Sequence, residues 1–139
     1  MKEPRWIADD EALALHGMQL AAFGGSPGIR DEGLLESALA RPRHRFTYTT
    51  TPSLPELGAA YAFGIVRNHP FADGNKRTGL VVAFVFLELN GMEVRASEED
   101  AYAIFLSLAA GRLTESALAE WLTGNSIRVR SRASSGRKS

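Results

Sequence analysis

Apolar residues recur along most of this chain at the three- and four-residue spacing of amphipathic helices, with short polar breaks between them. The pattern predicts helices over residues 11–23, 31–40, 54–68, 75–90, 97–111 and 114–122. Residues that cap helix N-termini stand at several of the starts, with Asp9 or Asp10 before the first helix and Asp31, Ser53 and Thr114 before later ones. The 75–90 segment is apolar all round, which indicates burial. We therefore predict an all-α fold, a compact bundle of about six helices around a buried central helix.

Two segments between these helices are predicted to be extended. Pro42 is expected to stop the second helix, because a proline inside a helix lacks an N–H and clashes with the preceding turn. Residues 43–52 then alternate and are rich in β-branched and aromatic side chains, which favours an extended chain. Gly91 is expected to end the central helix, and residues 92–95 to form a short extended link.

The length and composition fit a single domain with an ordinary hydrophobic core, since 45% of the 139 residues are hydrophobic. The chain has no cysteine, which excludes disulfides and cysteine-based zinc sites. His16 and His44 are too isolated to suggest a metal site and are interpreted as surface or packing residues. No run of signal-peptide length follows the N-terminus, and the longest apolar run, residues 80–87, is too short to cross a membrane. We expect a cytoplasmic protein without a membrane partner.

The net charge of zero conceals an uneven distribution. Residues 126–139 carry five basic residues and no acidic one, which leaves 11 basic and 16 acidic residues in the rest of the chain. We expect one folded domain over residues 1–124 and a basic, disordered tail over residues 125–139. An acidic body offers no footprint for specific nucleic-acid recognition, although a basic tail alone gives salt-sensitive, non-specific attachment.

The richest chemistry lies just before the central helix, where residues 69–77 read His-Pro-Phe-Ala-Asp-Gly-Asn-Lys-Arg. The unpaired N–H groups and the dipole of a helix N-terminus attract an anion. Lys76 and Arg77 carry the wrong charge for that end of a helix unless an anion binds there. Asp73 suits Mg²⁺, which prefers one or two carboxylates plus phosphate oxygens, and His69 suits general-base work near neutral pH. Together these residue types indicate a phosphate-transfer site.

A simpler interpretation of the same loop also exists. His69 and Asp73 would then only cap a helix, while the neighbouring cations are solvated. Gly74 is expected to permit a backbone turn that other residues disfavour, and Asn75 to cap the helix, bind phosphate, or do both. Phe71 is expected to anchor the loop in the core rather than to touch a substrate.

The nonapeptide resembles the signature of the Fic/Doc family, His-x-Phe-x-Asp/Glu-x-Asn-Lys/Gly-Arg, and matches it completely through Arg77. Residues 28–39 and the Trp121-Leu122 pair are similar to the Doc branch, the death-on-curing toxins of bacterial toxin–antitoxin pairs. The resemblance implies the compact helical bundle of that family with a short extended flap. It also implies ATP and Mg²⁺ as cofactors.

Two chemistries occur in the family that the chain resembles. Fic proteins transfer AMP from ATP to a protein hydroxyl, and their motif has glycine where this chain has Lys76 and a second arginine where it has Leu80. Asn-Lys-Arg is the Doc form, which implies transfer of the γ-phosphoryl group, with a threonine of elongation factor Tu as target and a block of translation as the outcome. The implied catalytic residues are His69, Asp73, Lys76 and Arg77, with Asp73 as metal ligand and Gly74, Asn75, Lys76 and Arg77 binding the nucleotide. AMP transfer remains the alternative.

The resemblance also implies partners. The family's inhibitory helix has Ser/Thr-x-x-x-Glu followed by Gly or Asn, whereas here Trp121 follows Glu120, so inhibition is expected from another chain. We expect an antitoxin whose C-terminal segment folds as a helix in a groove lined by Leu15, Met18, Leu34 and Leu35. Residues 45–50 lie where the family places its flap and would pair with a strand of the target, or serve as a plain connector. A catalytically inactive, partner-binding module is a further alternative.

Overall fold

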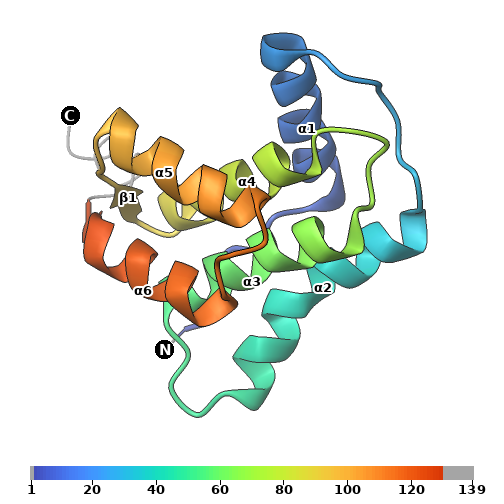
Figure 1. Cartoon of the computed structure of the whole chain (residues 1–139). Coiled ribbons are helices and arrows are strands. Elements are labelled where there is room, and N and C mark those ends of the chain that lie inside the picture. Colours follow the sequence, from blue (N-terminus) through green and yellow to red (C-terminus); the bar gives the residue numbers. More distant parts are fainter. Residues whose placement is uncertain (1, 130–139) are drawn as a thin grey trace, which may run out of the picture.

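The computed structural model describes residues 2–129, which form six helices and one small two-stranded sheet (Figure 1). The elements follow the order α1 (Asp9–Phe23), α2 (Glu32–Tyr48), α3 (Leu54–Asn68), α4 (Asn75–Leu89), β1 (Met92–Val94), α5 (Glu98–Ala109), α6 (Glu115–Asn125) and β2 (Ser126–Arg128). The predicted all-α fold is confirmed. Within the described residues, no helix combines the length and the apolar character needed to cross a membrane.

The centre of the bundle is shared by α3 and α4 rather than held by α4 alone. Helix α3 packs against α2, α4 and α6, and small residues make this possible. A Cβ on Gly64 of α3 would lie 2.9 Å from the backbone oxygen of Ala38 in α2, and one on Gly79 of α4 would lie 3.0 Å from that of Ala62 in α3. The helix backbones therefore approach so closely that a side chain at Gly64 would require the helices to shift, and one at Gly79 would be tightly crowded.

The predicted caps at Asp31, Ser53 and Thr114 are confirmed, and Ser97 caps α5 in the same way. The side chains of Asp31, Ser53, Ser97 and Thr114 each accept a hydrogen bond from the backbone N–H three residues further on, at 2.9–3.2 Å. The cap predicted for the first helix is wrong, because α1 begins at Asp9 and its cap position is Ala8. There the Glu11 carboxylate accepts a 2.9 Å hydrogen bond from the Ala8 N–H and supplies the missing partner.

Helix α2 does not stop at Pro42. It continues to Tyr48, so the prediction of an extended chain is wrong for residues 43–48 and holds only near Thr49, whose backbone is extended. Contacts with distant segments outweigh the local preference for an extended chain. Arg45 pairs with Glu115 of α6 at 3.6 Å, and the Phe46 ring lies edge-on to Trp6 with centroids 5.7 Å apart.

The C-terminal prediction also needs correction. Residues 124 and 125 complete α6, and β2 then pairs antiparallel with β1, placing Glu93 opposite Ile127. The expectation of disorder is therefore wrong for residues 125–128, because backbone hydrogen bonds to residues 92–94, within the predicted extended link, give this short segment a partner. The rest of the predicted tail, from residue 130 on, lies outside the described residues.

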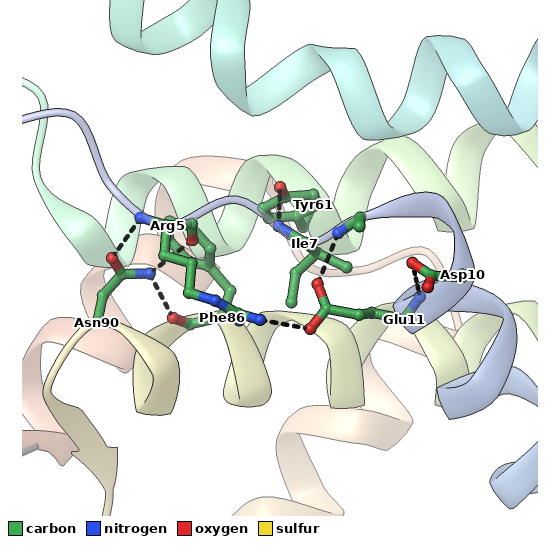
Figure 2. A network of polar contacts seen from close by, with 8 residues as sticks. Arg5, Ile7, Asp10, Glu11, Tyr61, Phe86 and Asn90 are labelled. Carbon is green, nitrogen blue, oxygen red and sulfur yellow. Dashed lines mark hydrogen bonds and ion pairs between the residues drawn. The ribbon is translucent and has the colours of Figure 1, made fainter. Parts of the chain in front are cut away.

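The N-terminal segment crosses α3 and α4 and is fixed by the polar contacts that Figure 2 shows. Asn90 accepts from the Arg5 N–H at 2.8 Å and donates to the Arg5 carbonyl at 3.0 Å. The buried Tyr61 hydroxyl accepts a 2.9 Å hydrogen bond from the Ile7 N–H, and burial raises the pKa of Tyr61 to about 12. This segment thereby sets the position from which α1 starts toward the loop at residues 69–74.

Candidate active site

The loop between α3 and α4 begins with a strained histidine. His69 has φ 54° and ψ 51°, which makes it the one non-glycine residue with positive φ among those described. Arg30 holds this conformation, because its Nε donates to the His69 carbonyl at 2.7 Å and its NH2 group donates to the Asn68 carbonyl at 2.9 Å. A guanidinium at the C-terminus of α3 also complements the helix dipole.

The segment before α2 runs antiparallel beside the loop. Ile29 and Phe71 form an isolated bridge, the Arg30 N–H donates to the Pro70 carbonyl at 2.6 Å, and the Ala72 N–H donates to the Gly28 carbonyl at 3.0 Å. The Phe71 side chain is fully buried, which confirms that it anchors the loop in the core. Backbone hydrogen bonds to residues 28 and 30 thus hold one side of the loop, and the buried Phe71 ring anchors it in the core.

Asn75 ties the two halves of the loop together. Gly74, not Asn75, is the N-cap of α4, so the prediction of Asn75 as the cap is wrong. The Asn75 side chain is buried, accepts from the Phe71 N–H at 2.9 Å and donates to the Phe71 carbonyl at 3.0 Å. Its Nδ2 also lies 3.1 Å from Nδ1 of His69. The Phe71 contacts fix which end of the amide is the donor, so Nδ1 of His69 accepts and the neutral ring carries its proton on Nε2.

Asp73 is exposed and its carboxylate is oriented by backbone donors. Oδ1 accepts from the Gly74 N–H at 3.0 Å, and Oδ2 accepts from the Ser26 N–H at 3.2 Å. A Cβ on Gly25 would lie 2.9 Å from Oδ2, so the turn after α1 lies close to the carboxylate and leaves no room for a side chain. Each carboxylate oxygen keeps a further lone pair, which fits a single-carboxylate Mg²⁺ site completed by phosphate oxygens. Residues 2–129 contain no cluster of three or more metal-binding side chains, so such an ion would depend on the phosphates.

The two cations of the loop are available to an anion. Among the described residues, neither Lys76 nor Arg77 forms an ion pair, and Lys76 is exposed. The Arg77 guanidinium lies between two aromatic rings, 4.1 Å from the Phe23 centroid and 5.0 Å from the Phe105 centroid. Aromatic faces hold the charge without neutralising it, so the N–H donors of Arg77 remain free to bind a phosphate.

All the predicted site residues come together in one place. A cavity of about 240 Å³ is lined by His69, Asp73, Gly74, Asn75, Lys76, Arg77 and Phe105. A neighbouring cavity of about 300 Å³ shares Asp73, Gly74 and Arg77 with it and extends toward the end of α1. A larger hollow of about 710 Å³ lies between α2 and α3 and contains none of these residues. The candidate site therefore lies at the N-terminus of α4.

Several residues that shape the site could not be identified from the sequence. Arg30, Phe23 and Phe105 act on the loop from other elements. His16, interpreted as a surface or packing residue, is buried against the loop and bonds to its backbone. In the sequence, His16 stands out only as a polar residue within an apolar stretch of the first helix.

The groove predicted for an antitoxin is partly wrong. Leu35 is a core residue, 4% exposed, and cannot line an open surface. Leu15 and Leu34 are half-buried, whereas Met18 is 63% exposed. Of the four residues, Met18 alone is exposed.

The sequence of this chain is similar to those of known proteins. A sequence model of the Fic/DOC family matches residues 6–87, a range that includes the whole loop. The chain is 36% identical over 118 residues to "Protein kinase doc" of Escherichia phage P1, an alignment that covers 85% of this chain and 93% of the phage protein. It is 42% identical over 76 residues to "Toxin Doc" of Mycolicibacterium smegmatis, covering 54% of this chain and 58% of that protein.

Proposed function

The chain belongs to the Fic/DOC family, and we propose that it is a Doc-type toxin that transfers the terminal phosphoryl group of ATP to a hydroxyl side chain of a translation factor. The observation that carries this proposal is the cavity at the N-terminus of α4, where His69, Asp73, Lys76 and Arg77 meet. Its relatives are named as a protein kinase and a toxin, and the protein kinase aligns with most of this chain. The translation factor follows from the resemblance to the Doc branch, with elongation factor Tu as the expected target in the cytoplasm.

The charges around the cavity suit a phosphate chain. The N-terminal N–H groups of α4, the Lys76 ammonium and the Arg77 guanidinium stabilise negative charge on the transferred group. Asp73 holds the Mg²⁺ that accompanies ATP, and the ion supplies charge neutralisation on the phosphate oxygens. Positioning and electrostatics account for most of the catalysis of phosphoryl transfer, so a rigid loop that presents these groups is the main requirement.

His69 is proposed to take the proton of the target hydroxyl. In the present arrangement its Nδ1 accepts from Asn75, which leaves the proton on Nε2. For Nε2 to act as the base, the exposed ring must turn away from Asn75 and carry its proton on Nδ1 instead. We expect the arrival of the nucleotide and the target to drive this rotation.

Lys76 and Leu80 favour phosphoryl transfer over AMP transfer. Lys76 adds bulk and charge where the AMP-transferring form has glycine. Leu80 stands where that form has a second arginine, and its side chain is packed in the core of the bundle, 8% exposed. The group that would steady the terminal phosphates in the AMP-transferring pose is therefore missing.

An antitoxin is the proposed inhibitor. Met18 and Phe23 are exposed apolar residues of α1, and Phe23 directly precedes the turn whose Gly25 lies close to the Asp73 carboxylate. A helix that folds against the end of α1 at Phe23 would cover the approach to the loop.

Labelled ATP distinguishes these chemistries in one experiment. The purified chain is incubated with Mg²⁺, elongation factor Tu and ATP labelled at either the α- or the γ-phosphate, with His69→Ala as control. We expect label on the target from γ-labelled ATP only, and none with the variant. Label from α-labelled ATP would establish AMP transfer, and no label from either would indicate an inactive module or a different target.

A further inference from the structure

A buried histidine on α1 contacts the catalytic loop although the proposed chemistry does not use it. The His16 side chain is 5% exposed. Its ring stacks on the Phe71 ring, with centroids 3.8 Å apart and planes 8° from parallel. Its Nε2 lies 2.8 Å from the backbone carbonyl oxygen of Asp73. A carbonyl oxygen only accepts, so Nε2 carries a proton and donates it to this bond.

We infer that His16 is a positioning residue of the active site, and that it acts through the Nε2–H bond to the Asp73 carbonyl rather than through its bulk. This inference rests on the proposed phosphoryl transfer for its effect on activity. Its structural part, that the bond fixes the loop, stands on the geometry alone. Because α1 lies far from residue 73 in sequence, the bond joins the loop to a separate element.

The bond acts on a peptide group that helps to orient the Asp73 carboxylate. The Asp73 carbonyl and the Gly74 N–H belong to the same planar unit. The carbonyl side accepts from His16 at 2.8 Å, and the N–H side donates to Oδ1 of the Asp73 carboxylate at 3.0 Å. If this unit rotated, both bonds would break together, and the carboxylate would keep only the Ser26 N–H of the two donors that orient it.

The same peptide group leads into the first turn of α4. Gly74 is the N-cap and has φ 76°, which is a left-handed conformation. Because glycine has no side chain, its backbone could also adopt several other conformations. A Cβ placed on Gly74 would lie 3.7 Å from Nε2 of His16 and 3.5 Å from Leu20, so α1 packs closely over this residue. His16 therefore restrains the most permissive residue of the loop, next to the N–H groups that would bind phosphate.

Two substitutions separate the hydrogen bond from the packing. His16→Gln keeps a side-chain N–H donor at nearly the same reach and removes the ring, whereas His16→Phe keeps a ring to stack on Phe71 and removes the donor. Ala14→Gln, at an exposed position of the same helix, serves as the matched control. For each protein we measure γ-label transfer at varied Mg²⁺–ATP, amide hydrogen exchange over residues 72–76, and urea unfolding.

We expect His16→Phe to raise the KM for Mg²⁺–ATP about tenfold and to speed exchange of the loop amides, a smaller effect than the roughly hundredfold loss that a 1 Å misplacement can cause. His16→Gln should restore both to within about twofold of the wild-type protein, because the donor is retained. Equal losses in the two variants would show that the ring packing matters and would overturn the inference. Unchanged kinetics and exchange in His16→Phe would overturn it as well.

If a variant fails to fold, a ¹⁵N NMR measurement on the wild-type chain still tests the His16 hydrogen bond. The ¹⁵N resonances of His16 should show a proton on Nε2 that exchanges slowly with solvent. A neutral ring protonated on Nδ1 alone would refute the bond directly. If the wild-type chain transfers no label, the proposed function fails, while hydrogen exchange and the ¹⁵N spectrum still decide the role of His16.

Discussion

Replacing Asn75 by alanine should weaken both the fold and the active site. The Asn75 side chain accepts from the Phe71 N–H at 2.9 Å and donates to the Phe71 carbonyl at 3.0 Å, in a part of the loop that is closed to solvent. Alanine leaves both backbone groups without these partners. The third contact, to Nδ1 of His69 at 3.1 Å, is also lost, but the proposed base form of His69 gives up this contact in any case, so the loss of activity comes from the loosened loop.

The size of the effect follows from the burial of these groups. Each buried backbone group left unsatisfied costs about 1–3 kcal/mol. Partial entry of water into the space left by the amide would reduce the sum, so we expect a loss of about 2–4 kcal/mol in the free energy of unfolding. A domain of this kind has about 5–15 kcal/mol of stability, so Asn75→Ala should remain folded at room temperature.

Urea unfolding followed by circular dichroism, together with γ-label transfer, provides the assay. Asn68→Ala is the matched control, because its amide donates one hydrogen bond, to the Leu34 carbonyl at 2.9 Å, and the group is only partly buried. We expect the control to lose about 1 kcal/mol and to keep its activity. A loss of stability in Asn75→Ala no larger than that of the control would refute the role assigned to Asn75.

The remaining predictions concern three other side chains. Lys76→Gly should reduce γ-label transfer at least tenfold, because a charge-assisted phosphate contact worth roughly 1.5–3 kcal/mol is lost, and retained transfer would remove Lys76 from the site. Arg30→Ala should lower kcat by about tenfold, since the two hydrogen bonds from Arg30 to the carbonyls of His69 and Asn68 are lost and the left-handed backbone of His69 loosens, whereas Arg30→Lys should recover part of it. Tyr61→Phe should cost about 1–2 kcal/mol in urea unfolding, because the Ile7 N–H loses its acceptor. The raised pKa of Tyr61, about 12 against the usual 10.0, makes the wild-type protein lose stability as the pH rises through that interval, and Tyr61→Phe should lose less.

Local features could be predicted from the sequence, and features that depend on distant contacts could not. The caps at Asp31, Ser53 and Thr114 act within four residues, so their side chains are sufficient evidence of a helix start. The continuation of α2 past Pro42 depends on Glu115 and Trp6, which lie far away in the sequence. Strand β2 was missed because three residues carry no periodicity of their own and pair only through β1.

The candidate site shows the same division. The nine-residue loop brings its own histidine, carboxylate and cations to one helix N-terminus, so the sequence alone predicts that they lie together. The residues that hold this loop in place reach it from elsewhere. His16 comes from α1 and Arg30 from the segment before α2, and neither forms a pattern that a single sequence reveals. The sequence therefore predicts the chemistry better than it predicts the support on which that chemistry depends.

The mass of elongation factor Tu isolated from bacteria expressing this chain tests the central claim most directly. Cells expressing His69→Ala at the same level provide the comparison, because the side chain is exposed and its loss should leave the fold intact. We predict that growth stops with the wild-type chain and that the factor gains a single phosphoryl group on a hydroxyl side chain, with neither effect in the variant. An added AMP group, an unmodified factor in arrested cells, or the same modification with His69→Ala would contradict the account.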